Sequence, residues 1–358
     1  QKLAGFFFQF KGMPQEVYDN YKSMIWATRV YESKTMMKLL EKEAGCKISD
    51  LFSEFNEVPI GIGSVSQVYK ARLKSGELVA VKIQYPDLFK AVQQDLAVLN
   101  RVVRLVKDFI PAIDHEKFIE KMHEIFYRES NFMSEAAVYD EIRSHLSENN
   151  HFIVPKIFHN LCSEKVLVME LMNGLKFYDF VENADYLKRQ QAFQHILEYD
   201  SILTFEYGML QMDYHPGNFL FTDSRLVCLD PGMYLKVSEA ERMVFKKIQK
   251  SIYGQDPHEL FKTFVDIGYI DGSRQSYTQE MAEFMNKTIS FVVMRDDCCD
   301  PLSDFVRIFF KTGANIFFAP EMMSIYLAFY NMAVLNGTLA KLNIDTERAF
   351  AGFKDRIA

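Results

Sequence analysis

Four polar residues in two distant stretches of the chain have the types and spacing needed to handle a phosphate-bearing ligand. Lys82 ends a short apolar run and supplies a fixed cation for phosphate oxygens. Asp213 and Asn218 lie five residues apart around a Pro-Gly pair, and Asp230 ends a second apolar run 12 residues after Asn218. Amide and carboxylate oxygens suit Mg²⁺, so Asn218 and Asp230 are the predicted metal ligands. Asp213 is left to orient or deprotonate the attacking group.

The order and spacing of these residues match the working parts of a protein-kinase-like ATP site. A glycine-containing loop, Gly61-Ile62-Gly63-Ser64, lies one strand before Lys82. Residues without bulky side chains let backbone N–H groups approach phosphate oxygens. A Gly-x-Gly sequence alone is more often a turn, but its place before Lys82 favours a phosphate cradle. The sequence therefore predicts that Gly61, Gly63 and Ser64 contact the nucleotide.

Lys82 needs a partner, because an ammonium within an apolar strand is costly unless it is paired. The alternative is an edge-strand lysine whose amine reaches water. Glu129 and Glu135 follow in a helical segment and are the candidate partners. At about 100° per residue they are roughly 240° apart around the helix axis, so both cannot face Lys82.

Helical and strand-like patterns alternate around these residues. Residues 14 to about 55 have helical apolar spacing, and strand-like runs at 65–73 and 78–84 predict a hairpin. A helical stripe begins at Leu88, and a second helix is expected to turn Phe132 and Met133 inward. Residues 152–154 are predicted to pair with 166–169, and residues 219–221 with 226–229. Residues 186–207 predict a helix, and from residue 239 onward nearly everything is helical in period.

Together these patterns predict an α+β fold with two lobes. The expected division is a helical extension over residues 1–58, a β-rich lobe with inserted helices over 59–174, and a helix-rich lobe over 175–358. With 358 residues, the chain is long enough to bury a large core.

Composition disfavours several other classes of protein. A formal net charge of −7 argues against broad nucleic-acid binding, which needs a cationic surface. The five cysteines lack zinc-type spacing, so neither a disulfide framework nor a structural metal is expected. The longest apolar stretch, residues 322–335, is too short for a membrane span of about 20 residues, so no transmembrane span is predicted. Because the chain begins at Gln1, a targeting peptide or anchor could precede it.

With these residues placed, the chain resembles the UbiB family of atypical kinases, also called aarF-domain kinases, which is linked to ubiquinone biosynthesis. The resemblance runs over nearly the whole chain. Its most specific parts are residues 50–55, 59–71, 79–86 and 213–218, together with Asp230.

The resemblance implies a two-lobed protein-kinase-like fold with an N-terminal helical extension and a helix-rich C-terminal lobe. It implies ATP and Mg²⁺ as cofactors. Carried over to this sequence, the phosphate lysine is Lys82 and the glutamate that pairs with it is Glu135. Asp213 becomes the catalytic aspartate, and Asn218 and Asp230 become the metal ligands.

The chain departs from the family pattern at several places near the expected site. Gly61 and Gly63 stand where the family usually has alanines. Lys2-Leu3-Ala4-Gly5 is a degraded form of the Lys-x-Gly-Gln motif that packs over the active site in the family. Its expected partner, Glu129-Ser130-Asn131, has asparagine in place of a second carboxylate. The occluding contact is therefore expected to be weakened or changed.

The leading interpretation is an atypical kinase or ATPase that supports ubiquinone biosynthesis or lipid homeostasis. Lys82 would bind the α/β-phosphates, and backbone groups from Glu170 to Met172 would meet the adenine. Expected partners are a membrane lipid or quinone precursor and quinone-biosynthesis proteins, at a mitochondrial membrane in a eukaryote or the cytoplasmic face of a bacterial membrane.

Two alternatives remain at this point. One is a nucleotide-binding pseudokinase scaffold without turnover. The other is a protein kinase acting in trans, although no Ala-Pro-Glu segment follows Asp230. The phosphoryl acceptor and the oligomeric state do not follow from the sequence.

Overall fold

The computed structural model describes two lobes of the chain. The described residues are 31–63, 65–106, 116, 119–120, 123–124, 127–128, 130–211, 214–231, 234–268, 270, 272–273, 276–293, 335, 339 and 341–344. Ser64, Glu129 and Asp213 lie outside them, as do residues 2–5, which carry the degraded motif, and residues 322–334 of the longest apolar stretch.

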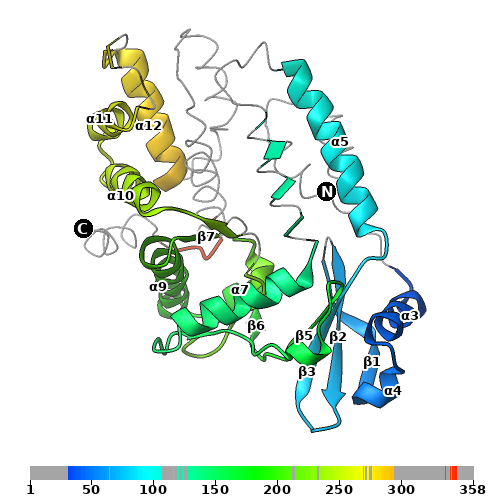
Figure 1. The fold of residues 1–358 in the computed structure, drawn as a ribbon. Helices are drawn as coiled ribbons and strands as arrows, with labels where there is room; N and C mark the ends of the chain where they lie inside the picture. The colour runs from blue at the N-terminus through cyan, green and yellow to red at the C-terminus, as the bar shows by residue number, and fades with distance from the viewer. Residues whose placement is uncertain are drawn as a thin grey trace.

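The first lobe is built around a four-stranded antiparallel sheet (Figure 1). Its strands, in spatial order, are β1 (Phe52–Ile62), β2 (Ser66–Leu73), β3 (Leu78–Gln84) and β5 (Val166–Glu170). The turn between β2 and β3 is closed by a hydrogen bond from the Leu73 amide to the Glu77 carbonyl. Gly76 in this turn has φ +105°, a conformation that glycine adopts without a steric cost. The predicted hairpin is confirmed.

β1 begins earlier than the sequence pattern predicts. The apolar spacing predicts a helix to about residue 55, but α4 (Ile48–Leu51) ends at Leu51 and β1 starts at Phe52. Phe52 and Phe55 have the spacing of a helix face, yet Phe55 packs across the sheet with its ring centroid 5.7 Å from that of Tyr69. β1 therefore runs across residue 58, where the sequence places the end of the extension.

Helices cover both faces of the first sheet. On one face, Val79, Val81 and Ile83 of β3 pack against α3 (Ser33–Ala44). On the other face, Ala80 packs with buried side chains of α7 (Phe132–His145). Because side chains alternate along a strand, Lys82 lies on the α7 face.

α7 buries a single stripe of side chains, formed by Phe132, Ala136, Tyr139 and Ile142. Phe132 points inward as predicted, whereas Met133 is 39% exposed and the prediction for it is wrong. At about 100° per residue, Met133 is rotated off the buried stripe. α5 (Leu88–Val106) is the long helix predicted to begin at Leu88, and it extends away from the sheet (Figure 1).

The second lobe contains two smaller sheets. The larger has the order β4 (Phe152–Ile153), β9 (Leu226–Cys228), β8 (Phe219–Phe221) and β6 (Leu175–Lys176), and the smaller pairs β7 (Met209–Gln211) with β10 (Tyr234–Lys236). The predicted pair of β8 and β9 is confirmed. The predicted pairing of residues 152–154 with 166–169 is wrong, because β4 runs parallel to β9 while β5 pairs with β3. Both stretches are apolar, and long-range contacts alone decide their partners.

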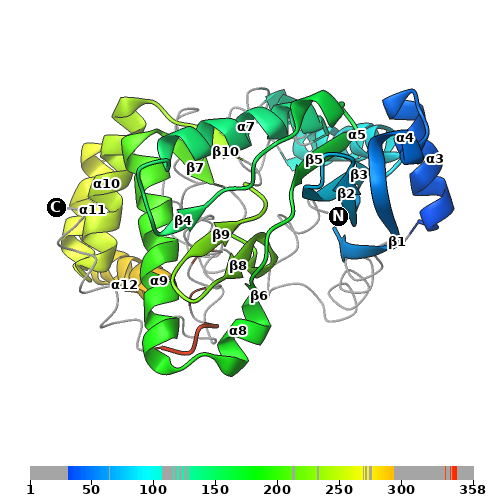
Figure 2. The same cartoon turned by 90° about the horizontal axis from the view of Figure 1, so that it is seen from below.

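Helices surround these sheets and complete the core of the second lobe. Those in the described part of it are α8 (Phe177–Asn183), α9 (Tyr186–Ser201), α10 (Glu239–Tyr253), α11 (Pro257–Asp266) and α12 (Gln279–Val293). The helix predicted over residues 186–207 is α9 followed by a π-helix, Ile202–Glu206. Short 3₁₀ turns occur at His159–Leu161 and Pro216–Asn218. α10, α11 and α12 lie at the end of the molecule farthest from the first sheet (Figure 2).

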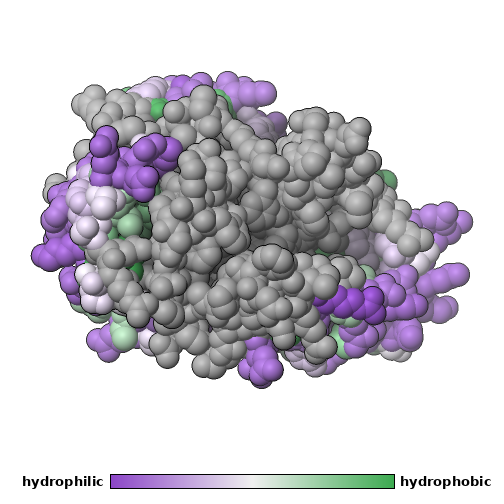
Figure 3. All heavy atoms as spheres, turned by 90° about the horizontal axis from the view of Figure 1, so that it is seen from above, coloured by the Kyte–Doolittle hydropathy of each residue, from purple (hydrophilic) through white to green (hydrophobic). Residues whose placement is uncertain are grey.

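In the view of Figure 3, the described residues that can be seen are mainly hydrophilic, and apolar ones form only small areas beside them. Within the described part of the chain, no helix combines the length and the apolar character needed to cross a membrane. The α+β fold with two lobes, expected from the sequence, is confirmed.

Candidate functional site

A cavity of about 960 Å³ lies between the two lobes and is lined by residues from both. The first lobe contributes Gly61, Gly63 and Lys82. The second contributes Asn218 and Asp230. Glu135, Glu170 and Met172 line it as well, so the structure brings together eight of the residues that the sequence predicts for the site.

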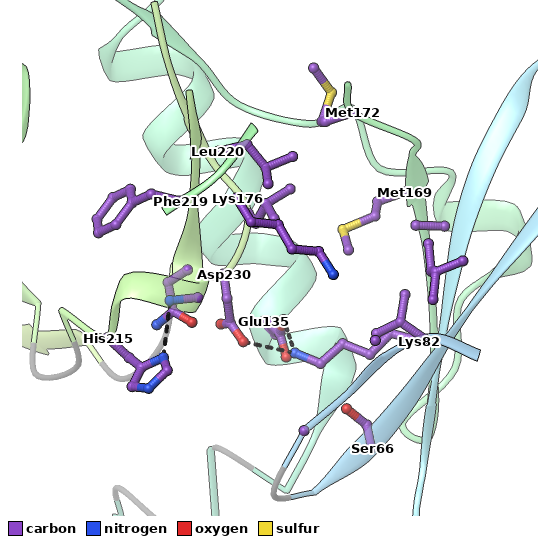
Figure 4. A pocket seen from close by; sticks show the side chains of 18 of the residues that line it. Ser66, Lys82, Glu135, Met169, Met172, Lys176, His215, Phe219, Leu220 and Asp230 are labelled. Atoms are coloured by element: carbon purple, nitrogen blue, oxygen red, sulfur yellow. Dashed lines mark hydrogen bonds and ion pairs between the residues drawn. The ribbon is translucent and has the colours of Figure 1, made fainter. Parts of the chain in front are cut away.

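Lys82 makes two close contacts with carboxylates at the wall of this cavity (Figure 4). Its Nζ lies 2.7 Å from Glu135 Oε1 and 3.2 Å from Asp230 Oδ2. The side chains of Lys82, Glu135 and Asp230 are 9%, 14% and 34% exposed, so these contacts are only partly screened by water. β3 is flanked by β2 and β5, so the edge-strand alternative for Lys82 does not apply. The ammonium also lies 5.0 Å from the centroid of the Phe132 ring.

The position of Glu135 follows from how α7 begins. Asn131 caps the helix, and its side chain accepts a hydrogen bond from the Met133 amide. Glu135 is in the first turn, where the N-terminal end of a helix favours a carboxylate. The helix thus directs one carboxylate at Lys82, while Glu129, the other candidate partner, lies outside the described residues.

Asn218 and Asp230 are held close together by backbone contacts. The Leu229 amide donates to the Asn218 carbonyl at 2.8 Å, which joins the 3₁₀ turn to the end of β9. Within the turn, His215 Nδ1 accepts a hydrogen bond from the Gly217 amide at 3.0 Å, as expected of a residue that packs the loop. A Cβ added at Gly217 would lie 3.0 Å from the same nitrogen, so glycine allows this close approach.

The pair Asn218 and Asp230 fits a magnesium ion that is shared with a phosphate-bearing ligand. Among the described residues there is no cluster of three or more His, Cys, Asp or Glu side chains that could hold a metal alone. Mg²⁺ in nucleotide sites commonly uses one or two protein ligands together with substrate phosphates and water. An amide oxygen and a carboxylate at the cavity wall satisfy that requirement. Asp213, the predicted catalytic residue, lies outside the described residues.

Gly63, in the glycine loop, is held by two hydrogen bonds to neighbouring residues. The Gly63 amide donates to the Ser66 carbonyl at 2.8 Å, and the Tyr85 hydroxyl donates to the Gly63 carbonyl at 2.9 Å. In this arrangement the Gly63 amide is not directed at a ligand. A Cβ added at Gly61 or Gly63 would meet neighbours at 3.6 Å, an ordinary contact. Alanine would therefore fit at both positions, and the glycines are not required by packing.

The sequence predicts that backbone groups from Glu170 to Met172 meet the adenine, and two of their three amides are already bonded within the protein. The Glu170 amide donates a hydrogen bond to the Lys156 carbonyl at 2.8 Å. The Leu171 amide donates one to the Leu78 carbonyl at 3.1 Å. Among the described residues, the amide of Met172 has no such partner. Met172 lines the cavity, so its amide can serve as a donor to a ligand.

Lys176 is a lining residue that the sequence did not indicate. It is paired with Leu220 across β6 and β8, and Figure 4 shows its side chain extending into the cavity. It forms no ion pair with any described residue. Gly174 allows this placement, because a Cβ there would lie 2.9 Å from Leu220 Cβ. The sequence contains no sign of this role, because the position of Lys176 depends on the pairing of two strands from distant segments.

Comparisons with known proteins agree with this geometry. A family model described as the ABC1 atypical kinase-like domain matches residues 27–264. AarF domain-containing protein kinase 1 from Xenopus laevis is 27% identical over 236 residues, which are 63% of this chain and 45% of that protein. Probable protein kinase UbiB from Pseudomonas fluorescens is 24% identical over 267 residues, 72% of this chain and 50% of that protein. The chain thus spans half or less of these relatives' lengths.

A solved structure shares the fold. It is described as the complex structure of Rv3197-erythromycin from Mycobacterium tuberculosis, with a TM-score of 0.65 and 20% sequence identity, and the match covers 94% of this chain and 87% of that one. The kinase-like fold implied by the resemblance is therefore confirmed. Since the family model covers more than half of its residues, the chain belongs to the ABC1 family of atypical kinase-like proteins, whose members include UbiB and the aarF-domain kinases.

Proposed function

We propose that this protein is an atypical kinase or ATPase that binds Mg-ATP in the cavity between its lobes. The observation that carries the proposal is the contact of Lys82 with Glu135 and Asp230 at the wall of that cavity. A partly buried ammonium held between two carboxylates from different lobes is expensive to maintain, and it suits a site that receives phosphates.

Each residue has a separate role in this proposal. Lys82 binds the α/β-phosphates, and Glu135 holds its ammonium in place at 2.7 Å. Asn218 and Asp230 hold Mg²⁺, which when bound would neutralise charge on the phosphate oxygens. Asp213 orients the attacking group. The rest of the nucleotide would contact Gly61, Gly63, Ser64, Glu170 and Met172. The contact with Gly63 would not use its amide, which is bonded to Ser66.

The position of Lys176 supports an anionic ligand in the cavity. Lys176 and Lys82 both line it, and Lys176 has no carboxylate partner among the described residues. A ligand with several negative charges would be attracted by both amines. The Met172 amide would meet the adenine, because Met172 lines the cavity and its amide donates to no described residue.

The proposed cellular role is based on the family to which the chain belongs. UbiB is the name of one relative, and the proposal for this chain is phosphoryl transfer or ATP hydrolysis that supports isoprenoid-quinone biosynthesis or lipid homeostasis. Its partners would be a membrane lipid or quinone precursor and quinone-biosynthesis proteins. The place of action would be a mitochondrial or bacterial membrane surface.

The test is Mg²⁺-dependent ATP hydrolysis, measured with and without lipid vesicles and a phenolic quinone precursor. Asp213→Asn should lower turnover by about 10²-fold or more, typical of a positioned acid or base. Its affinity for ATP and Mg²⁺ should stay within a few-fold, because Asp213 acts in the transition state. Asp223→Asn is the matched control, since the Asp223 side chain is 100% exposed.

Each outcome separates the candidate functions. Binding without turnover in the parent chain would favour the scaffold alternative. Phosphate transfer to an added protein would favour a kinase acting in trans. If the parent hydrolyses ATP and Asp213→Asn hydrolyses it at the same rate, the proposed role of Asp213 is wrong.

A further inference from the structure

A carboxylate is buried beneath the turn that carries Asn218, and the proposed chemistry does not use it. Asp200, on α9, is 4% exposed. Its Oδ1 accepts hydrogen bonds from the Tyr214 hydroxyl at 2.6 Å and from Thr204 Oγ1 at 3.3 Å. No Lys, Arg or His among the described residues forms an ion pair with it. A buried carboxylate without a cation is costly, so its presence calls for a physical reason.

The surroundings of Asp200 are mostly phenolic. The titratable groups that act on it or respond to it are Tyr214, Tyr234 and Tyr253, all fully or almost fully buried. Tyr234 is in turn hydrogen-bonded to Tyr199 at 2.8 Å. Asp200 raises the pKa of the Tyr214 hydroxyl further above the level set by burial, which keeps it a proton donor.

Tyr214 connects this buried carboxylate to the turn. It is 0% exposed and directly precedes the turn, and Phe219 directly follows it. The two rings stack with centroids 6.2 Å apart and planes 13° apart, so they enclose both ends of residues 215–218. The 2.6 Å bond from Tyr214 to Asp200 is short, as expected for a hydroxyl that donates to a carboxylate.

We propose that Asp200 is a positioning residue, which acts through the Tyr214 hydroxyl to hold the turn of residues 215–218 and so to place the Asn218 side chain. The alternative is that Asp200 only fills the core of the second lobe. Its role in holding a metal ligand rests on the proposed Mg-ATP function, but its effect on the turn does not.

Hydrogen exchange of the nucleotide-free chain tests the effect on the turn. The amides of Gly217, Asn218 and Leu229 report on it, because each donates to a group of the turn. Tyr214→Phe should raise their exchange rates at least tenfold, since a hydrogen bond to a charged group is lost. Asp200→Ala should do the same, whereas Asp200→Asn, which keeps an oxygen acceptor, should restore most of the protection.

Tyr199→Phe is the matched control. Tyr199 is as deeply buried and also loses a hydroxyl hydrogen bond, but its partner is Tyr234 on β10. In Tyr199→Phe, the exchange rates of the Gly217, Asn218 and Leu229 amides should match those of the parent. Unchanged rates in Tyr214→Phe, or an equal rise in Tyr199→Phe, would overturn the proposal. So would an Asp200→Asn variant that exchanges as fast as Asp200→Ala.

Metal-dependent binding then tests the effect on Asn218. Tyr214→Phe should weaken the Mg²⁺-dependent part of ATP binding about tenfold and leave metal-free binding unchanged. Added to Asn218→Ala, it should cause no further loss, because both changes act on one group. Full additivity of the two losses would overturn the link to Asn218. If the parent shows no Mg²⁺-dependent binding, the proposed function fails, and the exchange rates still decide whether Asp200 holds the turn.

Discussion

Asp200→Asn should stabilise the protein at neutral pH, although it removes a hydrogen-bonded core residue. Burial raises the pKa of the Asp200 carboxyl from its ordinary value of 3.8 to about 6, and hydrogen bonds from Tyr214 and Thr204 only partly oppose the rise. Asparagine has a similar shape and can still accept the Tyr214 hydrogen bond. It carries no charge, so the cost of burying an ionised group disappears.

The size and sign of the effect follow from the two pKa values. The folded chain binds the Asp200 proton more tightly than the unfolded chain does. Its contribution to the free energy of unfolding is therefore fully present below pH 3.8 and is lost as the pH rises to about 6. A difference of about two units corresponds to about 3 kcal/mol at pH 7.5. An unpaired amide donor in the variant would offset about 1 kcal/mol of this gain.

Urea unfolding at several pH values measures this difference. At pH 7.5 the midpoint of Asp200→Asn should exceed that of the parent by up to about 1 M, for a urea dependence of about 3 kcal/mol per molar. Near pH 4 the two midpoints should nearly coincide. Asp223→Asn is the control, because its carboxylate is fully exposed in a weak pair with Lys188. If Asp200→Asn is less stable than the parent at pH 7.5, or if their difference does not change between pH 4 and 7.5, the reasoning about burial is wrong.

Three further predictions concern the cavity. Lys82→Ala should abolish most of the rise in melting temperature that ATP gives the parent, roughly 2–4 °C at 100-fold excess over the dissociation constant; an unchanged rise would contradict the assigned role. Asp230→Asn should weaken Mg²⁺-dependent binding more than metal-free binding in titration calorimetry, and equal parent affinity with and without Mg²⁺ would remove the basis for the metal site. Lys176→Gln should weaken ATP binding about tenfold but leave adenosine binding unchanged, with Lys188→Gln as a surface control; an equal loss for both ligands would place Lys176 away from the phosphates.

Local signals in the sequence were enough to predict the parts of the fold that depend on neighbouring residues. The β2–β3 hairpin follows from two β-branched runs around Gly76. Because side chains alternate along a strand, Lys82 and Val81 point to opposite faces of the sheet. The start of β1 was missed because Phe52 and Phe55 fit a helical period as well as they fit the sheet. Only packing against Tyr69 decides between the two.

In the site, too, local patterns predicted some residues, whereas those that depend on long-range packing were missed. Motif spacing identified residues that the structure brings to one cavity, among them Lys82, Asn218 and Asp230. Lys176 was missed because it reaches the cavity through the pairing of β6 with β8, which no local pattern encodes. Asp200 was missed because a lone acid within a helical stripe has the appearance of a solvent-facing residue until its burial is known.

β4 links the two lobes, because it lies between strands of the first sheet in the chain but pairs in the second lobe. Its two residues precede the last strand of the first sheet in the chain, yet they complete the sheet of the second lobe beside β9. A gene fragment cut at residue 174 would therefore separate Phe152 and Ile153 from the strand that they adjoin. During synthesis this strand emerges well before its partner and must wait for it, so the second sheet closes late. A chimera that replaces the second lobe from residue 174 onward would therefore also have to replace this strand.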